Sequence, residues 1–210
     1  MIARPNNWNE IKEPTERRTL DIVAGVAKVK QAVVKNSDWG AQLCILFDLS
    51  EGEYAGYYQQ DFDMQKPNPG EEKRWKGVLR MWLPKEDGTE QDEWSKRSLK
   101  GMATAFEKSN PGYTWNWDEK SLAGKYIGII YRNEEWEYNG KTGWSKRPFR
   151  CTSIDKVREG AVKAPKDKPL KNKATTPSYG SDYGTGYGDT YSTQGYGNYA
   201  DLEDSEMLPF

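Results

Sequence analysis

The chain has 210 residues, with 31 basic and 32 acidic side chains and a formal net charge of -1. It contains no histidine and only two cysteines, which excludes a histidine-based triad, a histidine general base and a structural zinc site. Nine Trp and 13 Tyr are more than a core of this size needs, so we expect exposed aromatic side chains.

The composition changes along the chain. Residues 1–158 mix apolar runs with charged residues, and we predict that they form one domain. Residues 159–200 read as a disordered linker, rich first in Lys and Pro and then in Gly, Tyr and Ser, and residues 201–210 form an acidic tip. Five lysines and seven acidic residues lie from Ala161 onward, so 26 basic and 25 acidic residues precede it. A nucleic-acid site must therefore be a local stripe on a nearly neutral domain.

The first half of the domain predicts three strands. The run Leu20–Val34 alternates, with valines on one face and Lys28 and Lys30 on the other. Ala41–Leu49 alternates in the same way, and a turn leads into a third predicted strand, Tyr54–Phe62. Gly25 in the first run would permit a bulge or a bend, as closed barrels often require.

The second half predicts a helix and two further strands. Asp63–Glu93 is expected to be an extended loop or a hairpin arm in which only Val78–Leu83 is ordered. Trp94–Lys108 has helical spacing of apolar residues. Strands are predicted at 124–131 and 143–157, and Asn139-Gly140 lies in the charged segment that separates them.

This order of elements predicts a mostly β fold. Three strands, a helix and two strands are the order of an OB-fold, a five-stranded barrel whose strand 2 and 3 face and loops bind oligonucleotides. Other small barrels fit the same runs. The two cysteines, Cys44 and Cys151, lie in apolar runs, so we expect buried free thiols and a reducing compartment.

Aromatic and basic residues alternate along the domain, as a single-stranded nucleic acid site requires. Bases stack on aromatic rings, and Lys and Arg neutralise phosphates. The candidate stacking residues are Trp39, Tyr54, Tyr57, Tyr58, Trp75, Trp82, Trp136 and Trp144. The candidate phosphate contacts are Lys28, Lys30, Lys35, Arg74, Lys76, Arg80, Arg132, Lys146 and Arg147. Each aromatic residue has core packing as its alternative.

The last ten residues have the chemistry of a peptide ligand. Acidic residues stand before an apolar end and the terminal carboxylate; the residues concerned are Asp201, Glu203, Asp204, Glu206, Leu208, Pro209 and Phe210. The acids steer the tip to basic surfaces, while the final Phe fills an apolar pocket and its carboxylate accepts hydrogen bonds from Arg or Lys. The alternative is an acidic end that only aids solubility.

The linker and tip resemble those of the bacterial single-stranded DNA-binding protein (SSB) family. These proteins join an OB domain through a Gly-rich linker to an acidic tip that ends in Leu/Ile-Pro-Phe, and Thr175–Phe210 reproduces both parts. The resemblance implies that Leu208, Pro209 and Phe210 recruit replication, recombination and repair proteins. Because the opening strand and the Asp63–Glu93 insertion depart from the usual pattern, the chain looks more like the divergent SSB-like proteins of phages and mobile elements.

The expected function is therefore stoichiometric coating of single-stranded DNA with little sequence preference, without cofactor, metal or catalytic residue. The expected location is the bacterial cytoplasm, since no apolar run approaches a membrane span. RNA binding and a homo-oligomer are left open. One alternative is a Mg²⁺-dependent nuclease that uses Asp61, Asp63 and Glu71-Glu72-Lys73. Another is a phage interaction protein that uses the tail alone and binds no DNA.

Overall fold

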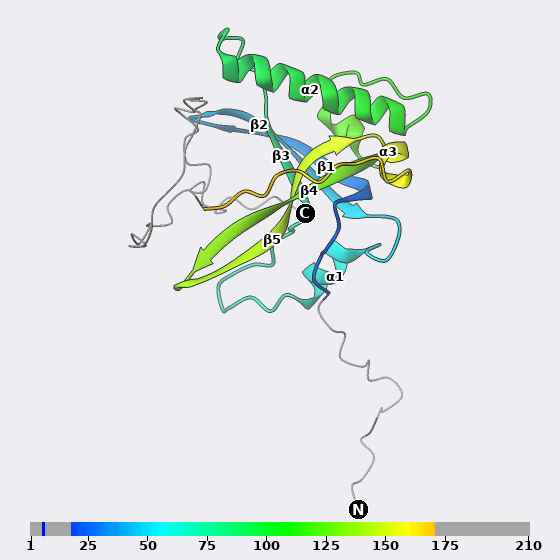
Figure 1. Cartoon of the computed structure of the whole chain (residues 1–210). Coiled ribbons are helices and arrows are strands. Elements are labelled where there is room, and N and C mark those ends of the chain that lie inside the picture. Colours follow the sequence, from blue (N-terminus) through cyan, green and yellow to red (C-terminus); the bar gives the residue numbers. More distant parts are fainter. Residues whose placement is uncertain (1–5, 7–17, 171–210) are drawn as a thin grey trace, which may run out of the picture. The chain divides into compact units, whose positions relative to one another are not determined.

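A computed structural model describes residue 6 and residues 18–170, and the latter belong to one compact unit that ends at Leu170. The fold is mostly β, with five antiparallel strands in one sheet in the order β3-β2-β1-β4-β5 (Figure 1). The strands are β1 (Ala24–Ser37), β2 (Gly40–Leu49), β3 (Val78–Trp82), β4 (Tyr126–Tyr138) and β5 (Lys141–Thr152). The helices are α1 (Tyr57–Met64), α2 (Glu90–Ser109), the 3-10 turn η1 (Glu119–Leu122) and α3 (Ile154–Arg158). In the described part, no helix is both long and apolar enough to cross a bilayer.

The first two predicted strands are confirmed, but the irregularity in β1 lies at a different residue. The register of β1 against β2 shifts between Val29 and Gln31, so the bulge is at Lys30. Gly25 instead leaves room for the Leu49 side chain, because a Cβ atom at residue 25 would lie only 2.7 Å from Leu49 Cδ2.

The third predicted strand is wrong: this segment forms helix α1. The backbone N–H groups at the start of this helix are satisfied by a side chain and not by a neighbouring strand. The Asp48 carboxylate accepts hydrogen bonds from the N–H groups of Tyr58 (2.9 Å) and Gln59 (3.2 Å). Gly56, at φ 71°, provides the left-handed turn into the helix. The observed third strand, β3, is the ordered part of the segment predicted as a loop.

The predicted helix is confirmed as α2, which starts earlier than its apolar pattern indicates. Thr89 caps it by accepting a hydrogen bond from the Asp92 N–H at 3.2 Å. The buried Asp92 carboxylate then accepts from the N–H groups of Lys85 and Glu86, both at 2.9 Å, and pairs with Lys96 at 2.8 Å. These polar contacts extend the helix beyond its apolar stripe.

The last two predicted strands are confirmed as a longer hairpin, β4–β5. Asn139 (φ 49°) and Gly140 (φ 72°) both have positive φ, as a two-residue hairpin turn requires. The predicted end of β5 is wrong, because residues 154–158 form α3. Cys44 and Cys151 are free thiols, with Cys44 buried and Cys151 partly exposed.

Both faces of the sheet contribute buried residues. On one face they are Val29, Ala32, Leu43, Ile45, Phe47, Leu79, Ile127, Ile129 and Tyr131. Val26, Cys44, Leu46 and Val78, on the opposite face, are also no more than 4% exposed. On the other face, α3 packs against Gly128, where a Cβ atom would lie 2.6 Å from Val157 Cγ2. The edge strands β3 and β5 approach one another without ladder pairing, so the sheet is not closed and the predicted barrel is not shown.

Replacing the carboxylate that caps α1 should destabilise the fold. Asp48→Ala leaves two N–H groups of the helix without their acceptor, and we expect the free energy of unfolding to fall by about 1 kcal/mol. Asp63→Ala is the matched control, because among the described residues this exposed carboxylate accepts only from the Gln59 side chain, at 3.0 Å. We expect that control to change stability by less than about 0.5 kcal/mol in urea denaturation. Equal losses in the two variants would contradict the capping role.

Candidate nucleic-acid interface

Two rows of side chains cross β1, β2 and β3 on the face of the sheet opposite Leu43, Ile45 and Phe47. Directly paired residues of antiparallel strands point to the same face. One row consists of Lys35, Gln42 and Trp82, and the next consists of Val33, Cys44 and Arg80. Three of the predicted nucleic-acid contacts, from two strands far apart in the sequence, are thus neighbours on one surface.

The bulge in β1 extends this surface toward the other end of the strand. Lys28 pairs with Asp48 and Lys35 pairs with Gln42, and residues 48 and 42 share a face of the regular strand β2. A strand without the bulge would place Lys28 and Lys35 on opposite faces, because the interval between them is odd. We call the surface that carries Lys28, Lys35, Arg80, Trp82 and Tyr126 the basic face.

Tyr126 is a residue of the basic face that the sequence analysis missed. It pairs with Lys28 across β1 and β4, its side chain is 39% exposed, and Lys28 Nζ lies 5.7 Å from its ring centroid. Lys125 Nζ lies 4.5 Å from the ring centroid of Tyr113 nearby. Alternation with the buried Ile127 and Ile129 was the available signal for Tyr126.

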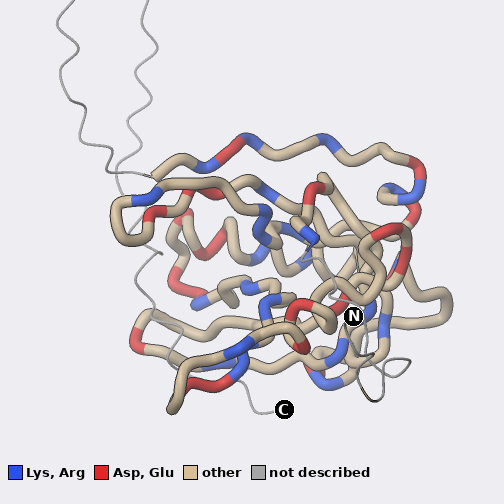
Figure 2. The backbone as a smooth tube through the Cα atoms, turned by 90° about the horizontal axis from the view of Figure 1, so that it is seen from below, with Lys and Arg blue, Asp and Glu red and all other residues tan. Residues whose placement is uncertain are grey.

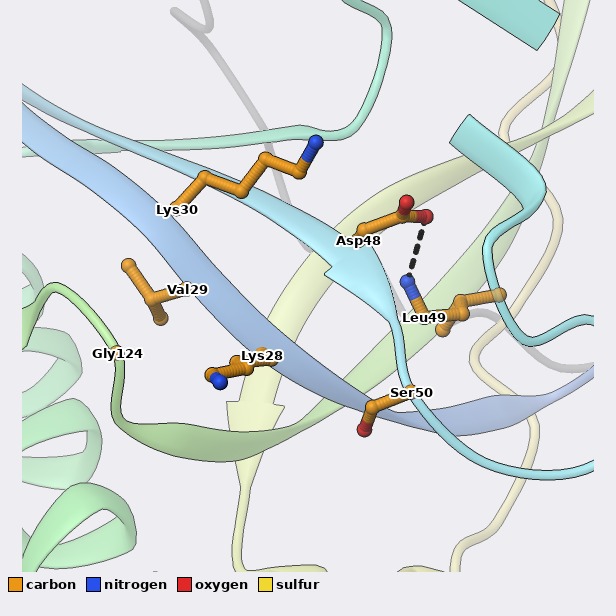
Figure 3. A pocket seen from close by; sticks show the side chains of 7 residues that line it. All are labelled: Lys28, Val29, Lys30, Asp48, Leu49, Ser50 and Gly124. Atoms are coloured by element: carbon orange, nitrogen blue, oxygen red, sulfur yellow. Dashed lines mark hydrogen bonds between the residues drawn. The ribbon is translucent and has the colours of Figure 1, made fainter. Parts of the chain in front are cut away.

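A shallow pocket of about 500 Å³ lies at this end of the basic face (Figure 3). It is lined by Lys28, Val29, Lys30, Asp48, Leu49, Ser50 and Gly124. Lys28 and Lys30 are both exposed and border the same hollow. Lys30 is also held in place, since its Nζ donates to Gln59 Oε1 at 2.6 Å and lies 4.0 Å from the Trp75 ring centroid.

Two hairpins flank the basic face with exposed aromatic residues. Trp39 is in the β1–β2 turn and is 70% exposed. Lys85 lies beside the same turn, because a Cβ atom on Gly40 would be 2.7 Å from its Cε. Figure 1 shows the β1–β2 and β4–β5 hairpins extending to the same side of the domain. The turns of the two hairpins therefore lie on the same side of the domain.

The β4–β5 hairpin beyond its pairing with β1, residues 131–148, is called the arm. Trp136 packs over Gly143, where a Cβ atom would be 2.6 Å from the indole, and Trp144 is half exposed. Arg132 and Arg147 pair directly across the two strands, and Arg132 forms an ion pair with Glu134. The arm thus carries four of the residues predicted to contact nucleic acid, which are Arg132, Trp136, Trp144 and Arg147.

Other predicted arm and loop residues have partners within the fold. Lys146 Nζ lies 3.8 Å from Asp21 Oδ1, and Lys76 Nζ lies 3.0 Å from Asp61 Oδ2. Arg74 is exposed in the loop before β3.

Two predicted stacking residues belong to the core. The Tyr58 hydroxyl lies 3.2 Å from the Tyr131 hydroxyl, and burial raises the pKa values of both phenols. Trp75 Nε1 donates to the backbone oxygens of Phe47 (3.1 Å) and Gly77 (3.2 Å). Because these rings are 5% and 8% exposed, we leave them out of the interface. Tyr54 and Tyr57 are half-buried and pack edge to face at 6.0 Å.

Further exposed aromatic residues do not belong to the paired rows of the basic face. Trp94 is on α2, Tyr138 is next to the β4–β5 turn, and Trp117 is between α2 and η1. Trp117 is 72% exposed and stacks on Trp115 at 4.9 Å. Exposure alone therefore does not define the interface, and the row pattern of the sheet is needed.

Figure 2 shows basic and acidic positions interspersed along the described chain. Among residues that the structure describes, no three His, Cys, Asp or Glu side chains form a group that could hold a metal ion. Asp61, one of the carboxylates weighed for a nuclease, is buried beside Lys76 and the Gln65 amide.

The cations of the basic face act on the Cys44 thiol. Burial raises the pKa of Cys44, and the positive charges of Arg80 and Lys35 oppose that rise. Arg80 and Lys35 therefore lie close enough to Cys44 for their charges to act on its thiol.

The chain matches no known family model and no curated protein. The predicted docking residues Asp201, Glu203, Asp204, Glu206, Leu208, Pro209 and Phe210 lie outside the described residues.

Removing the charge of Arg80 should raise the pKa of the Cys44 thiol further. Arg80→Met keeps the length of the side chain but not the cation that favours the thiolate, so less thiolate is present at a given pH. We expect the pH midpoint of iodoacetamide labelling at Cys44, read by peptide mass spectrometry, to move upward. Arg74→Met removes an exposed cation outside the two rows and should leave the midpoint unchanged. A midpoint that falls in Arg80→Met would contradict the geometry.

Proposed function

We propose that the protein binds single-stranded DNA along the basic face, with little sequence preference, and that its acidic tip recruits replication or recombination proteins. The observation that supports this most is the convergence of Lys35, Arg80 and Trp82 on one face of β1–β2–β3, with Trp39 at its border. Cations beside aromatic rings suit a chain of phosphates and stacked bases, since every base offers a π face.

The topology supports the same proposal. We infer an OB-like domain, because α2 lies between β3 and β4 and the two edge strands approach one another. OB-folds bind oligonucleotides on the face of strands 2 and 3, between the loop that joins strands 1 and 2 and the loop that joins strands 4 and 5. The basic face, the Trp39 turn and the arm occupy these three positions.

The local character of the charge determines the mode of binding. The domain is nearly neutral, so attraction from a distance is weak and contacts at the basic face must supply the affinity. Stacking is tolerant of sequence, which suits coating of exposed strands. Coating would prevent duplex re-formation, and the tip, by its resemblance to SSB tips, would bring partner proteins to the coated strand.

Two tryptophans of almost equal exposure provide a test of where DNA binds. Trp39→Ala removes a ring in the β1–β2 turn, and Trp117→Ala removes one in the loop between α2 and η1, outside the paired rows of the basic face. The two tryptophans are 70% and 72% exposed. Loss of one stacked base should weaken binding by about 1 to 3 kcal/mol, or roughly 5- to 150-fold. The measurement is the fluorescence anisotropy of labelled oligo-dT of about 20 nucleotides, longer than the roughly 4 to 16 nucleotides of one OB site.

Trp117→Ala should bind as the unmodified chain does. Equal affinities in all three proteins would remove Trp39 from the interface, and an absence of oligo-dT binding in the unmodified chain would refute the proposed function.

The salt dependence of binding tests the phosphate contact at Lys35. Lys35→Gln should reduce the slope of log K against log salt by about 0.7, the value for one phosphate of a single strand. Lys100→Gln, an exposed lysine on α2, is the control and should keep the slope. If the slope of log K against log salt is the same in both variants, the DNA phosphates do not contact Lys35.

A further inference from the structure

A segment that follows α3 returns along the free edge of β4. We call residues 161–170 the strap. Lys168 forms a parallel bridge with Glu134: the Lys168 N–H donates to Asn133 O, and the Glu135 N–H donates to Lys168 O, both at 2.9 Å. In Figure 1 the strap runs from α3 toward the side to which the two hairpins extend.

Side chains add to this backbone pairing. The N–H of Leu170 donates to Glu135 Oε2 at 3.2 Å, and Glu135 is only 8% exposed. The Lys168 ammonium lies 3.7 Å from Glu134 Oε2. A buried carboxylate that accepts a backbone hydrogen bond fixes both partners, because losing that bond leaves a buried charge less well satisfied.

The position of the strap explains why the arm needs it. β1 pairs with β4 from Tyr126 to Ile130, and the Tyr131 N–H donates to Val23 O, just before β1, at 2.8 Å. Beyond Tyr131 the described segment of β1 offers this edge of β4 no partner. A two-stranded hairpin by itself is marginally stable in water. The strap pairs with β4 at residues 133–135, directly beyond the end of the β1 pairing. It therefore takes the place of a third strand at the base of the arm.

We propose that the strap is a clamp that holds the arm in position to contact single-stranded DNA. This inference rests on the proposed function of the arm residues Trp136 and Trp144. The strap residues act through the arm and are positioning residues. It follows that the segment directly before residue 171 is part of the DNA-binding domain in function and not only a connection to the tip.

Two proline substitutions in the full-length chain test the clamp. Lys168→Pro removes the N–H that donates to Asn133 O. Lys166→Pro is the control. It also replaces a lysine by proline, but the N–H group of Lys166 has no hydrogen-bond partner in the described structure. The first readout is hydrogen exchange at the arm amides, and the second is oligo-dT affinity.

Lys168→Pro should speed exchange at residues 133–137 and weaken oligo-dT binding, each by at least about fivefold, because it removes one backbone hydrogen bond and the partly exposed ion pair with Glu134. Exchange in β1 and β2 should not change, and Lys166→Pro should resemble the unmodified chain in both readouts. Equal exchange in the two variants would overturn the clamp. Faster exchange with unchanged affinity would overturn its role in binding. If the unmodified chain binds no oligo-dT, the proposed function fails, and the exchange result still decides whether the strap holds the arm.

Discussion

The register of β1 against its two neighbours is the constraint on which the arrangement of the site depends. Strands have a side-chain period of two, so one extra residue reverses the face of everything that follows. The bulge at Lys30 reverses β1 once, and this brings Lys28 and Lys35 to the same face while Val29 and Ala32 both stay in the core. The apolar residues determine the register, because a slip would expose the core, and the cations take their positions from it.

The same constraint links stability to the proposed binding. Asp48 lies on the basic face, but its carboxylate caps α1, and α1 carries Tyr58 into the core against Phe47. The Asp48 carboxylate can therefore lie next to Lys28 and leave the basic face positive, because the N–H groups at the start of α1 stabilise its negative charge. The strap has a comparable role at the arm, where backbone pairing substitutes for a core that a hairpin cannot build alone.

Much of the fold could be predicted from periodicity, and the exceptions have identifiable causes. β1, β2, α2 and the β4–β5 turn follow from alternation, helical spacing and Asn-Gly chemistry. The segment Tyr54–Phe62 was misread because its aromatic residues alternate as in a strand, while the cap that makes it a helix is on Asp48, in another element. β3 was obscured by the prolines and charges around it.

The site shows the same division between local and long-range information. The residue types at Lys35, Arg80 and Trp82 were found from sequence, but their adjacency depends on pairing between strands that are far apart in the chain. Tyr58 and Trp75 are predicted stacking residues but are buried, because composition does not distinguish an aromatic ring in the core from one on the surface. Tyr126 was missed because it begins a strand that otherwise reads as core.

The most direct test of the central claim is photocrosslinking of oligo-dT to the full-length chain, with the modified peptides mapped by mass spectrometry. DNA that follows the basic face should crosslink at Trp39, Trp82 and Tyr126 and leave Trp117 unmodified, although Trp117 is the most exposed tryptophan described. Crosslinks confined to Trp94 and Trp117, or no crosslinks above those of a protein that does not bind DNA, would contradict the account.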